Sequence, residues 1–472
     1  MRWSVRAIGF VSTLVLVRVL SPHDFGIVAM ATIVTGFFEV FSETGQRLAI
    51  IRHPNPTREY VDTAWTAQLI VCLALAVATF LSAPLAELYF REPEATSVIQ
   101  LLALRPLLMG FENIGTVAFR RDLDFRKEFR YGVYQRAATS GTTIALAFWL
   151  RDFWALAIGI VAGQFLSLLI GYAMHPYRPR FSFHRMGEIW GFSNWILAGQ
   201  ASVYFHGRID QIALGGVENA SQRIGEYAVG VDIATMPTAE LVIPTSRALF
   251  PVFTRLASDA QALKRAYLDS LAVLSIICWS SGVGLALVSA DFAAVVLGPQ
   301  WTNVTPILPW IALAAAIFAL SNSVLTVHQA TGRARAFALQ SWLRVLMLIP
   351  FVLLAALTGD LETLAAARFI ATLLFVPILF ASLRAVFPFS ARELIAINVR
   401  PMLAAGAMTA AIFAVSHVLG DLHHAVRLLL LVPIGGCTFA LALVGLWHVA
   451  GRPDTAEKSI ITLAFNTVRR LS

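Results

Sequence analysis

The sequence predicts an all-α, polytopic membrane protein with about fourteen transmembrane helices. Hydrophobic residues make up 58% of the chain and charged residues only 14%, far from the composition of soluble proteins. The apolar stretches approach or reach the roughly 20 residues that a helix needs to cross a bilayer. They are apolar on all sides, as from Leu428 to Val449, whereas barrel strands would alternate in polarity over about 10 residues. Because lipid offers no partner for backbone groups, these spans must be helices.

The predicted spans follow one another with connections too short to hold a soluble catalytic domain. The first span is not a cleavable signal peptide, because it has no A-x-A-like site and contains Arg18. In chain order the spans are 3–20, 25–47, 65–90, 96–119, 130–150, 153–175, 190–214, 223–247, 267–297, 304–330, 335–358, 362–385, 395–419 and 424–450.

The basic residues give the predicted orientation. With a cytoplasmic N-terminus, 26 of the 36 basic residues fall on the cytoplasmic side and only four in the opposite loops. This is the asymmetry of the positive-inside rule, and an even number of spans returns the C-terminus to the cytoplasm. The distribution of the basic residues therefore indicates a membrane topology, and it does not indicate a nucleic-acid partner. The strong preference for Arg over Lys suggests a bacterial source and thus the inner membrane.

No sequence pattern indicates catalysis, a cofactor or a metal. The chain has no phosphate-binding loop and hence no ATP site of its own. Its cysteines lie within apolar runs and show no disulfide or metal-ligand spacing. They are Cys72, Cys278 and Cys437.

The chain repeats itself with an offset of roughly 200 residues. The segment Leu20–Ala29 after the first span is similar to Leu214–Ala228 after the seventh. Helical hairpins of any kind also share such features, which leaves a chance similarity open. A repeat of six spans each predicts two lobes in parallel orientation. The predicted parts are an N-terminal lobe 1–178, a second lobe 179–385, two additional helices in 386–450 and a cytoplasmic tail 451–472.

Several motifs resemble the Wzx-type polysaccharide flippases. They occur in family order over nearly the whole chain: Val15–Ala29, Gly45-x-x-x-Ala49-x-x-Arg52, Phe119-Arg-Arg-Asp-Leu-Asp-Phe, Asp210-x-x-x-x-Gly215, Ile224-Gly225-x-Tyr227, Leu249-Phe-Pro-Val-Phe-x-Arg255, Gly298-x-x-Trp301 and Ala330-Thr-Gly332. The resemblance implies the multidrug/oligosaccharidyl-lipid/polysaccharide exporter superfamily. Its members pair two six-helix lobes around a central cavity and move undecaprenyl-diphosphate-linked glycans across the inner membrane. The segment before the first helix is shorter than this family leads us to expect, which indicates a misassigned start codon or a clipped first span.

Ionisable residues at membrane depth are the candidate functional groups. Each costs about 2.5–3.5 kcal/mol on insertion scales, so such residues are seldom idle. They are Arg18, Glu39, Glu43, Arg105, Glu112, Arg136, Arg208, Asp210, Asp232, Glu240, Arg344 and Arg368.

Arginine suits phosphate because its planar group binds two oxygens at once. The predicted substrate-binding residues of a cationic cavity are Arg18, Arg52, Arg136, Arg208 and Arg344.

Acidic residues and one histidine are candidates for ion coupling. Residues four apart share a helix face, which pairs Glu39 with Glu43 and His206 with Asp210. Two carboxylates on one face repel, which raises the pKa of at least one. Asp232 and Glu240 occupy the corresponding helix of the second half. Lobe-stabilising ion pairs and a solvated face near the cytoplasmic mouth are the alternative interpretations.

The predicted function is the flipping of a lipid-linked oligosaccharide by alternating access. Its partners would be that substrate, membrane lipids, and a polysaccharide polymerase with its chain-length machinery. One alternative is a drug or cation antiporter of the same superfamily, which would favour a cavity dominated by carboxylates. Another is a membrane glycan polymerase, which would need a sizeable outer loop. A scaffold would leave the buried charges unexplained. The sequence names neither the glycan, the coupling ion nor the oligomeric state.

Overall fold

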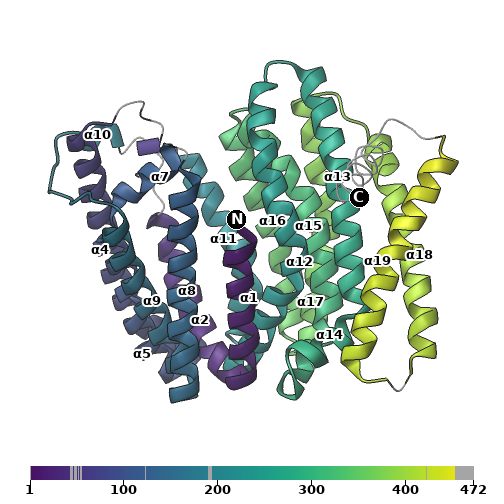
Figure 1. Ribbon diagram of the computed structural model, residues 1–472, viewed down its shortest axis with the longest axis horizontal. Coiled ribbons are helices and arrows are strands. Elements are labelled where there is room, and N and C mark those ends of the chain that lie inside the picture. The colour runs from purple at the N-terminus through teal and green to yellow at the C-terminus, as the bar shows by residue number, and fades with distance from the viewer. Residues whose placement is uncertain are drawn as a thin grey trace. The chain divides into compact units, whose positions relative to one another are not determined.

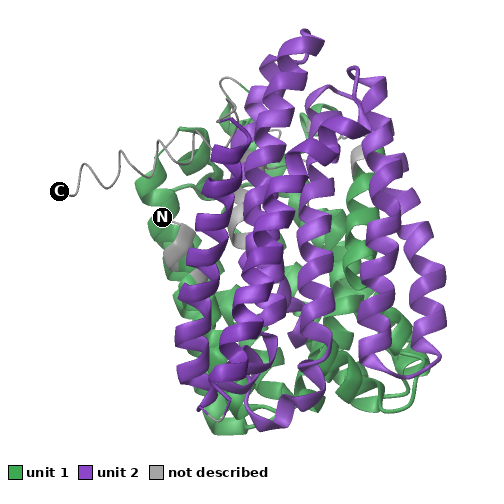
Figure 2. Cartoon of the chain, turned by 90° about the vertical axis from the view of Figure 1, so that its right-hand side faces the viewer, with its two compact units in different colours: residues 1–228 green, residues 229–472 purple. Residues whose placement is uncertain are grey.

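The computed structural model describes residues 2–42, 46, 50–51, 53, 56–122, 124–189, 194–420 and 422–451. Throughout these residues the secondary structure is helical, with no strand (Figure 1). The chain divides into two compact units, Met1–Ala228 and Val229–Ser472 (Figure 2). The six-helix lobes with limits at 178 and 385 stay a prediction.

The first unit holds the helices up to the start of α12. They are α1 (Arg2–Val19), α2 (Pro22–Ser42), α4 (Arg58–Phe90), α5 (Pro93–Leu102), α6 (Leu104–Gly110), η1 (Ile114–Thr116), α7 (Val117–Arg121), α8 (Phe125–Leu150), α9 (Phe153–Met174), α10 (Met186–Ile189) and α11 (Asn194–Leu214).

The helix α12 (Ala220–Arg255) runs through the division, and the second unit holds the rest. Its helices are α13 (Ala260–Leu287), α14 (Ser289–Val296), η2 (Pro299–Val304), α15 (Ile307–Ala330), α16 (Ala334–Ala356), α17 (Leu361–Ala381), η3 (Ser382–Ala385), α18 (Ala391–Val418) and α19 (His424–Val449).

The structure confirms a polytopic, all-α membrane protein. The described part of every predicted span coincides with one helix or a short series of helices. Among the described residues, nine helices are long and apolar enough to cross a membrane. The remaining predicted spans do not combine this length and apolarity in a single helix, so the number fourteen stays a prediction.

Two predicted spans are interrupted in the structure. The span predicted over 96–119 is divided among α5, α6, η1 and α7. Pro106 lies in the first turn of α6 and has no backbone N–H to continue the ladder of α5, so a new helix begins there. The span predicted over 267–297 ends one helix at Leu287 and begins another at Ser289.

The starts of α2 and α12 cross closely, and a glycine on each helix allows it. A Cβ atom at Gly26 would lie 1.6 Å from the carbonyl oxygen of Ser221, and one at Gly225 would lie 1.9 Å from that of Pro22. The two contacts are reciprocal, because the offset in residue number from Gly26 to Gly225 equals the offset from Pro22 to Ser221. The similar segments at the start of each half therefore meet each other in space.

In the second unit, α18 and α19 pack on α13 and α14. Asn398 of α18 joins α13, because its Oδ1 accepts hydrogen bonds from Ser275 Oγ at 2.7 Å and Trp279 Nε1 at 3.0 Å. His424 at the start of α19 lies 2.7 Å from Asp291 of α14. An apolar cavity of about 650 Å³ remains among α13, α18 and α19, with Leu285, Met408 and Phe439 in its wall.

Candidate functional site

The helix α11 has a buried face and a partly exposed face. His206 and Asp210 are 7% and 2% exposed, and Asp210 Oδ2 accepts a hydrogen bond from the Tyr227 hydroxyl at 3.0 Å. Tyr204 and Arg208 are partly exposed. The four-residue spacing thus separates His206 and Asp210 from a face that carries an aromatic ring and a cation.

Arg208 shares a face of α11 with two residues that line an apolar groove in the first unit. Its Nη1 donates a hydrogen bond to Gln211 Oε1 at 2.9 Å. Tyr204 and Ile212, one turn before and one turn after Arg208, both line a groove of about 370 Å³. The groove lies among α2, α4 and α11, and its wall is almost entirely hydrocarbon: Ile33, Val34, Phe37, Phe38, Ser82, Leu85, Ala86, Tyr89, Phe90 and Phe205 complete it.

Two tyrosines hold the helices around this groove. The Tyr204 hydroxyl of α11 donates to the carbonyl oxygen of Ile33 in α2. The Tyr89 hydroxyl of α4 donates to the carbonyl oxygen of Ile212 in α11 at 2.6 Å. Both bonds join backbone of one helix to a side chain of another, so the groove has a defined wall.

Glu39 of α2 is paired with Arg105 of α6. Arg105 Nη1 lies 2.5 Å from Glu39 Oε1, with the carboxylate side chain 20% exposed. The second predicted carboxylate, Glu43, lies outside the described residues. The sequence shows Arg105 at membrane depth, but the pairing joins residues 66 positions apart, and no local spacing predicts it.

The other predicted site residues occupy varied positions. Arg18 on α1, Arg136 on α8 and Asp232 on α12 are exposed. The Arg136 guanidinium lies over α1, since a Cβ atom at Gly9 would be 2.1 Å from its Nη2. Arg52 and the side chain of Glu240 lie outside the described part of the chain. That the five predicted arginines line one cavity stays a prediction.

Arg344 is the buried member of that set among the described residues. Its side chain on α16 is 6% exposed, and its Cζ lies 4.7 Å from the ring centroid of Phe318 and 5.4 Å from that of Phe375. Burying an ion costs several kcal/mol, while a desolvated cation–π contact returns about 2 kcal/mol. Its Nη2 has no hydrogen-bond partner among the described residues.

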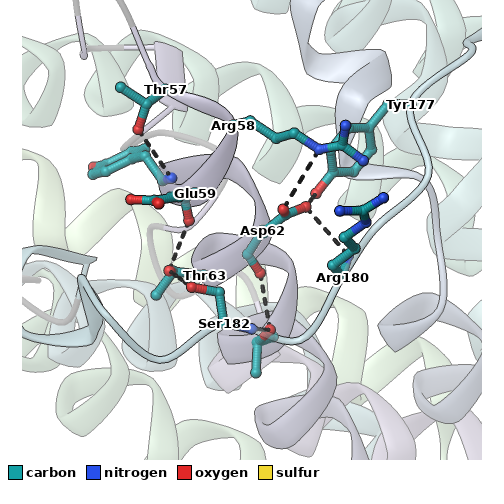
Figure 3. A network of polar contacts seen from close by, with 10 residues as sticks. Thr57, Arg58, Glu59, Asp62, Thr63, Tyr177, Arg180 and Ser182 are labelled. Atoms are coloured by element: carbon teal, nitrogen blue, oxygen red, sulfur yellow. Dashed lines mark hydrogen bonds and ion pairs between the residues drawn. The ribbon is translucent and has the colours of Figure 1, made fainter.

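A buried carboxylate that sequence reasoning missed fixes the connection after α9. This connection, residues 175–185, is called the strap below. Asp62 near the start of α4 is 5% exposed; its Oδ1 accepts hydrogen bonds from the Tyr177 hydroxyl at 2.5 Å and from the Arg180 N–H at 3.2 Å (Figure 3). Its Oδ2 lies 3.8 Å from Arg58 Nε. Tyr177 and Arg180 are over 100 positions away from Asp62, so only its place in an apolar run could have drawn attention to it.

Further contacts tie the strap along its length. Ser182 accepts a hydrogen bond from Thr63 Oγ1 at 2.9 Å, and its N–H donates to Thr66 Oγ1 at 3.0 Å (Figure 3). Asn113 Nδ2 donates to the carbonyl oxygens of His175 and Tyr177, each at 3.1 Å. The strap is therefore attached both to α4 and to the segment before η1.

Two groups of the strap have shifted pKa values. Burial, and then the hydrogen bond to Asp62, raise the pKa of Tyr177 far above its usual value. Burial, helped by the charges of Lys127 and Arg178, lowers the pKa of His175. The neutral imidazole fits its contacts, because His175 Nδ1 accepts a hydrogen bond from the Tyr177 N–H at 3.2 Å.

Residues 15–306 match the family model described as "Polysaccharide biosynthesis protein". The chain is 23% identical to the lipopolysaccharide biosynthesis protein WzxC of Escherichia coli (strain K12), over 70% of this chain and 69% of that protein. It is 24% identical to the succinoglycan biosynthesis transport protein ExoT of Rhizobium meliloti (strain 1021), over 75% and 72% of the two chains.

Solved structures show the same fold. The lipid II flippase MurJ in an inward closed conformation superposes with a TM-score of 0.75, at 12% identity and over 95% of this chain and 99% of that chain. An inward-facing multidrug resistance transporter of the MATE family, in the MOP superfamily, gives a TM-score of 0.60 at 15% identity, over 79% and 94%. By its family model, this chain belongs to the polysaccharide biosynthesis protein family.

Proposed function

We propose that this protein is a flippase for a lipid-linked oligosaccharide and moves polysaccharide repeat units across a bacterial inner membrane. Family membership supports the pathway, and the names of WzxC and ExoT place those relatives in polysaccharide biosynthesis and transport. The substrate would combine a polyprenyl chain, a diphosphate and a sugar head. The protein would then move its substrate without making or breaking covalent bonds.

The observation that carries this proposal is the position of Arg208. On α11, Arg208 shares a helix face with Tyr204 and Ile212, which both line a groove of about 370 Å³ whose wall is almost entirely hydrocarbon. A lipid phosphate needs both features, because its charge binds a guanidinium while its chain prefers an apolar surface. Glu39 is neutralised by Arg105, which disfavours a cavity dominated by free carboxylates, as a cation antiporter would require.

Arg208→Ala should lower flipping of a fluorescent undecaprenyl-diphosphate-linked glycan in proteoliposomes by about 10- to 100-fold, as the loss of a charge-assisted hydrogen bond predicts. Arg208→Lys should recover only part of the rate, because the ammonium lacks the planar fork. The control is Arg126→Ala, at an exposed position early in α8, which should flip at the normal rate. Normal flipping by properly inserted Arg208→Ala would contradict this role.

A further inference from the structure

A cationic site with unsatisfied donors lies within the unit Val229–Ser472, where α16 packs beside α15 and α17. Its centre is Arg344, whose guanidinium faces the rings of Phe318 and Phe375. A phenylalanine ring is not a hydrogen-bond acceptor of ordinary strength. The N–H groups of the guanidinium therefore still need an acceptor. Nη2 has none among the described residues.

A second unsatisfied donor lies one turn earlier on the same helix. Ser341 is 4% exposed, and its buried Oγ has no hydrogen-bond partner among the described residues. Residues three apart share a helix face, so the hydroxyl and the guanidinium project from α16 in similar directions. Arg368 on α17 adds a positive charge that acts on Arg344. A guanidinium stays protonated in proteins, so the positive charge of this site is permanent.

We propose that Arg344 and Ser341 bind a small inorganic anion, represented by chloride, among α15, α16 and α17. Such an anion would accept hydrogen bonds from both groups and neutralise the buried charge. It would thereby stabilise the packing of α16 against its two neighbours.

The surroundings favour a small monovalent anion over a lipid-linked diphosphate. Val345, Leu348 and Ala371 are each 2% exposed, and Phe375 is 3% exposed. A closely packed apolar interior excludes a sugar head and a polyprenyl chain, and it raises the cost of dehydrating a multiply charged phosphate. The site is therefore separate from the substrate role proposed for Arg208, and it stands or falls independently of that role.

The test uses the purified full-length protein in detergent, in buffers of equal ionic strength. Replacing choline gluconate by choline chloride should raise the melting temperature by about 2 °C or more, as a ligand specific for the folded state does. The ³⁵Cl NMR line of chloride should broaden in the presence of the protein, and bromide should compete. Ser341→Ala should weaken the chloride effect several-fold while the buried charge remains.

Arg344→Gln should abolish both the chloride stabilisation and the line broadening. The matched control is Arg333→Gln at the exposed N-cap of the same helix, which removes an equal charge and should keep both effects. Equal stability of the unmodified protein in chloride and gluconate would overturn the proposal without any variant. Line broadening that survives in folded Arg344→Gln would do so as well, and stabilisation by phosphate alone would refute the assignment to a small monovalent anion.

Discussion

At the scale of single residues, the Asp62 carboxylate holds the strap through two hydrogen bonds. Its carboxylate is buried, yet its hydrogen-bonding capacity is used by Tyr177 and the Arg180 backbone. A buried carboxylate without such donors would be strongly destabilising. The local order of the strap therefore depends in part on these two polar contacts.

Tyr177→Phe should loosen the strap, because it leaves Asp62 with one donor fewer. A hydrogen bond to a charged group contributes about 1.5–3 kcal/mol. Limited trypsin digestion should therefore cut after Arg180 and Arg185 faster than in the unmodified protein. Tyr134→Phe, an exposed tyrosine on α8, is the control and should leave the cleavage rate unchanged. Equal rates in both variants would mean that backbone contacts suffice.

The same strap should loosen at both ends of the pH range. The pKa of Tyr177 is raised above its unfolded value, so its contribution is complete below about pH 10 and declines as the pH rises further. The pKa of His175 is lowered, so its contribution is complete above about pH 6.5 and declines as acid protonates the ring. The rate of strap cleavage measures this loosening, with trypsin at alkaline pH and pepsin at acid pH. Each rate is divided by the rate on an unfolded substrate at the same pH, which corrects for the pH dependence of the protease. Corrected rates that do not change with pH would contradict the two pKa shifts.

Asp210 is the best-placed coupling candidate among the described residues. It is 2% exposed and accepts a hydrogen bond from Tyr227. If a proton binds one arrangement of the transporter better than another, a neutral mimic biases that equilibrium. Asp210→Asn should then slow flipping and flatten its pH dependence in vesicles with an imposed pH gradient. The control is Asp269→Asn, at an exposed position on α13, which should keep the normal pH dependence of flipping. An unchanged pH dependence in Asp210→Asn would mean that the Asp210 carboxylate has only a structural role.

At the scale of elements, the crossing of α2 and α12 depends on two glycines. Their backbones approach so closely that a methyl group on either would overlap a carbonyl oxygen of the other helix. Packing of this kind cannot relax by a rotamer change, because backbone atoms are on both sides. The helices themselves would have to separate.

Gly26→Ala and Gly225→Ala should therefore each destabilise the protein by about 1–3 kcal/mol or more. Gly207→Ala on α11 is a matched control, since a Cβ atom there meets nothing within 4 Å. That variant should be neutral or slightly stabilising, because alanine favours helix more than glycine does by about 1 kcal/mol. Thermal unfolding in detergent measures all three. Melting temperatures of Gly26→Ala and Gly225→Ala that match Gly207→Ala would show that the helices cross more loosely.

At the scale of the whole molecule, the membrane topology is the main prediction. It rests on the 26-to-4 distribution of basic residues between the two sides. Reporter fusions after Arg126, Arg180 and Arg335 should report the cytoplasm, and fusions after Glu94, Glu218 and Asp421 the outside. Two or more reversed fusions would refute the fourteen-span topology together with the cytoplasmic termini.

The sequence by itself determined that this protein lies in a lipid bilayer, and this determined its fold class. Length and polarity of the apolar stretches leave helices as the only way to satisfy the backbone in lipid, so 424–450 and α19 agree closely. The four-residue spacing on α11 likewise placed His206 and Asp210 on one face, because helix geometry is local. The motifs also pointed to the family that the comparisons established.

Only the tertiary structure decided which distant residues meet. The pairing of Glu39 with Arg105, the attachment of Tyr177 to Asp62 and the contact of buried Arg344 with two rings join separate parts of the chain. The reciprocal contact of Gly26 and Gly225 turned a weak sequence similarity into a defined crossing. Periodicity describes one helix at a time, whereas these contacts depend on how helices rotate and cross when their surfaces pack.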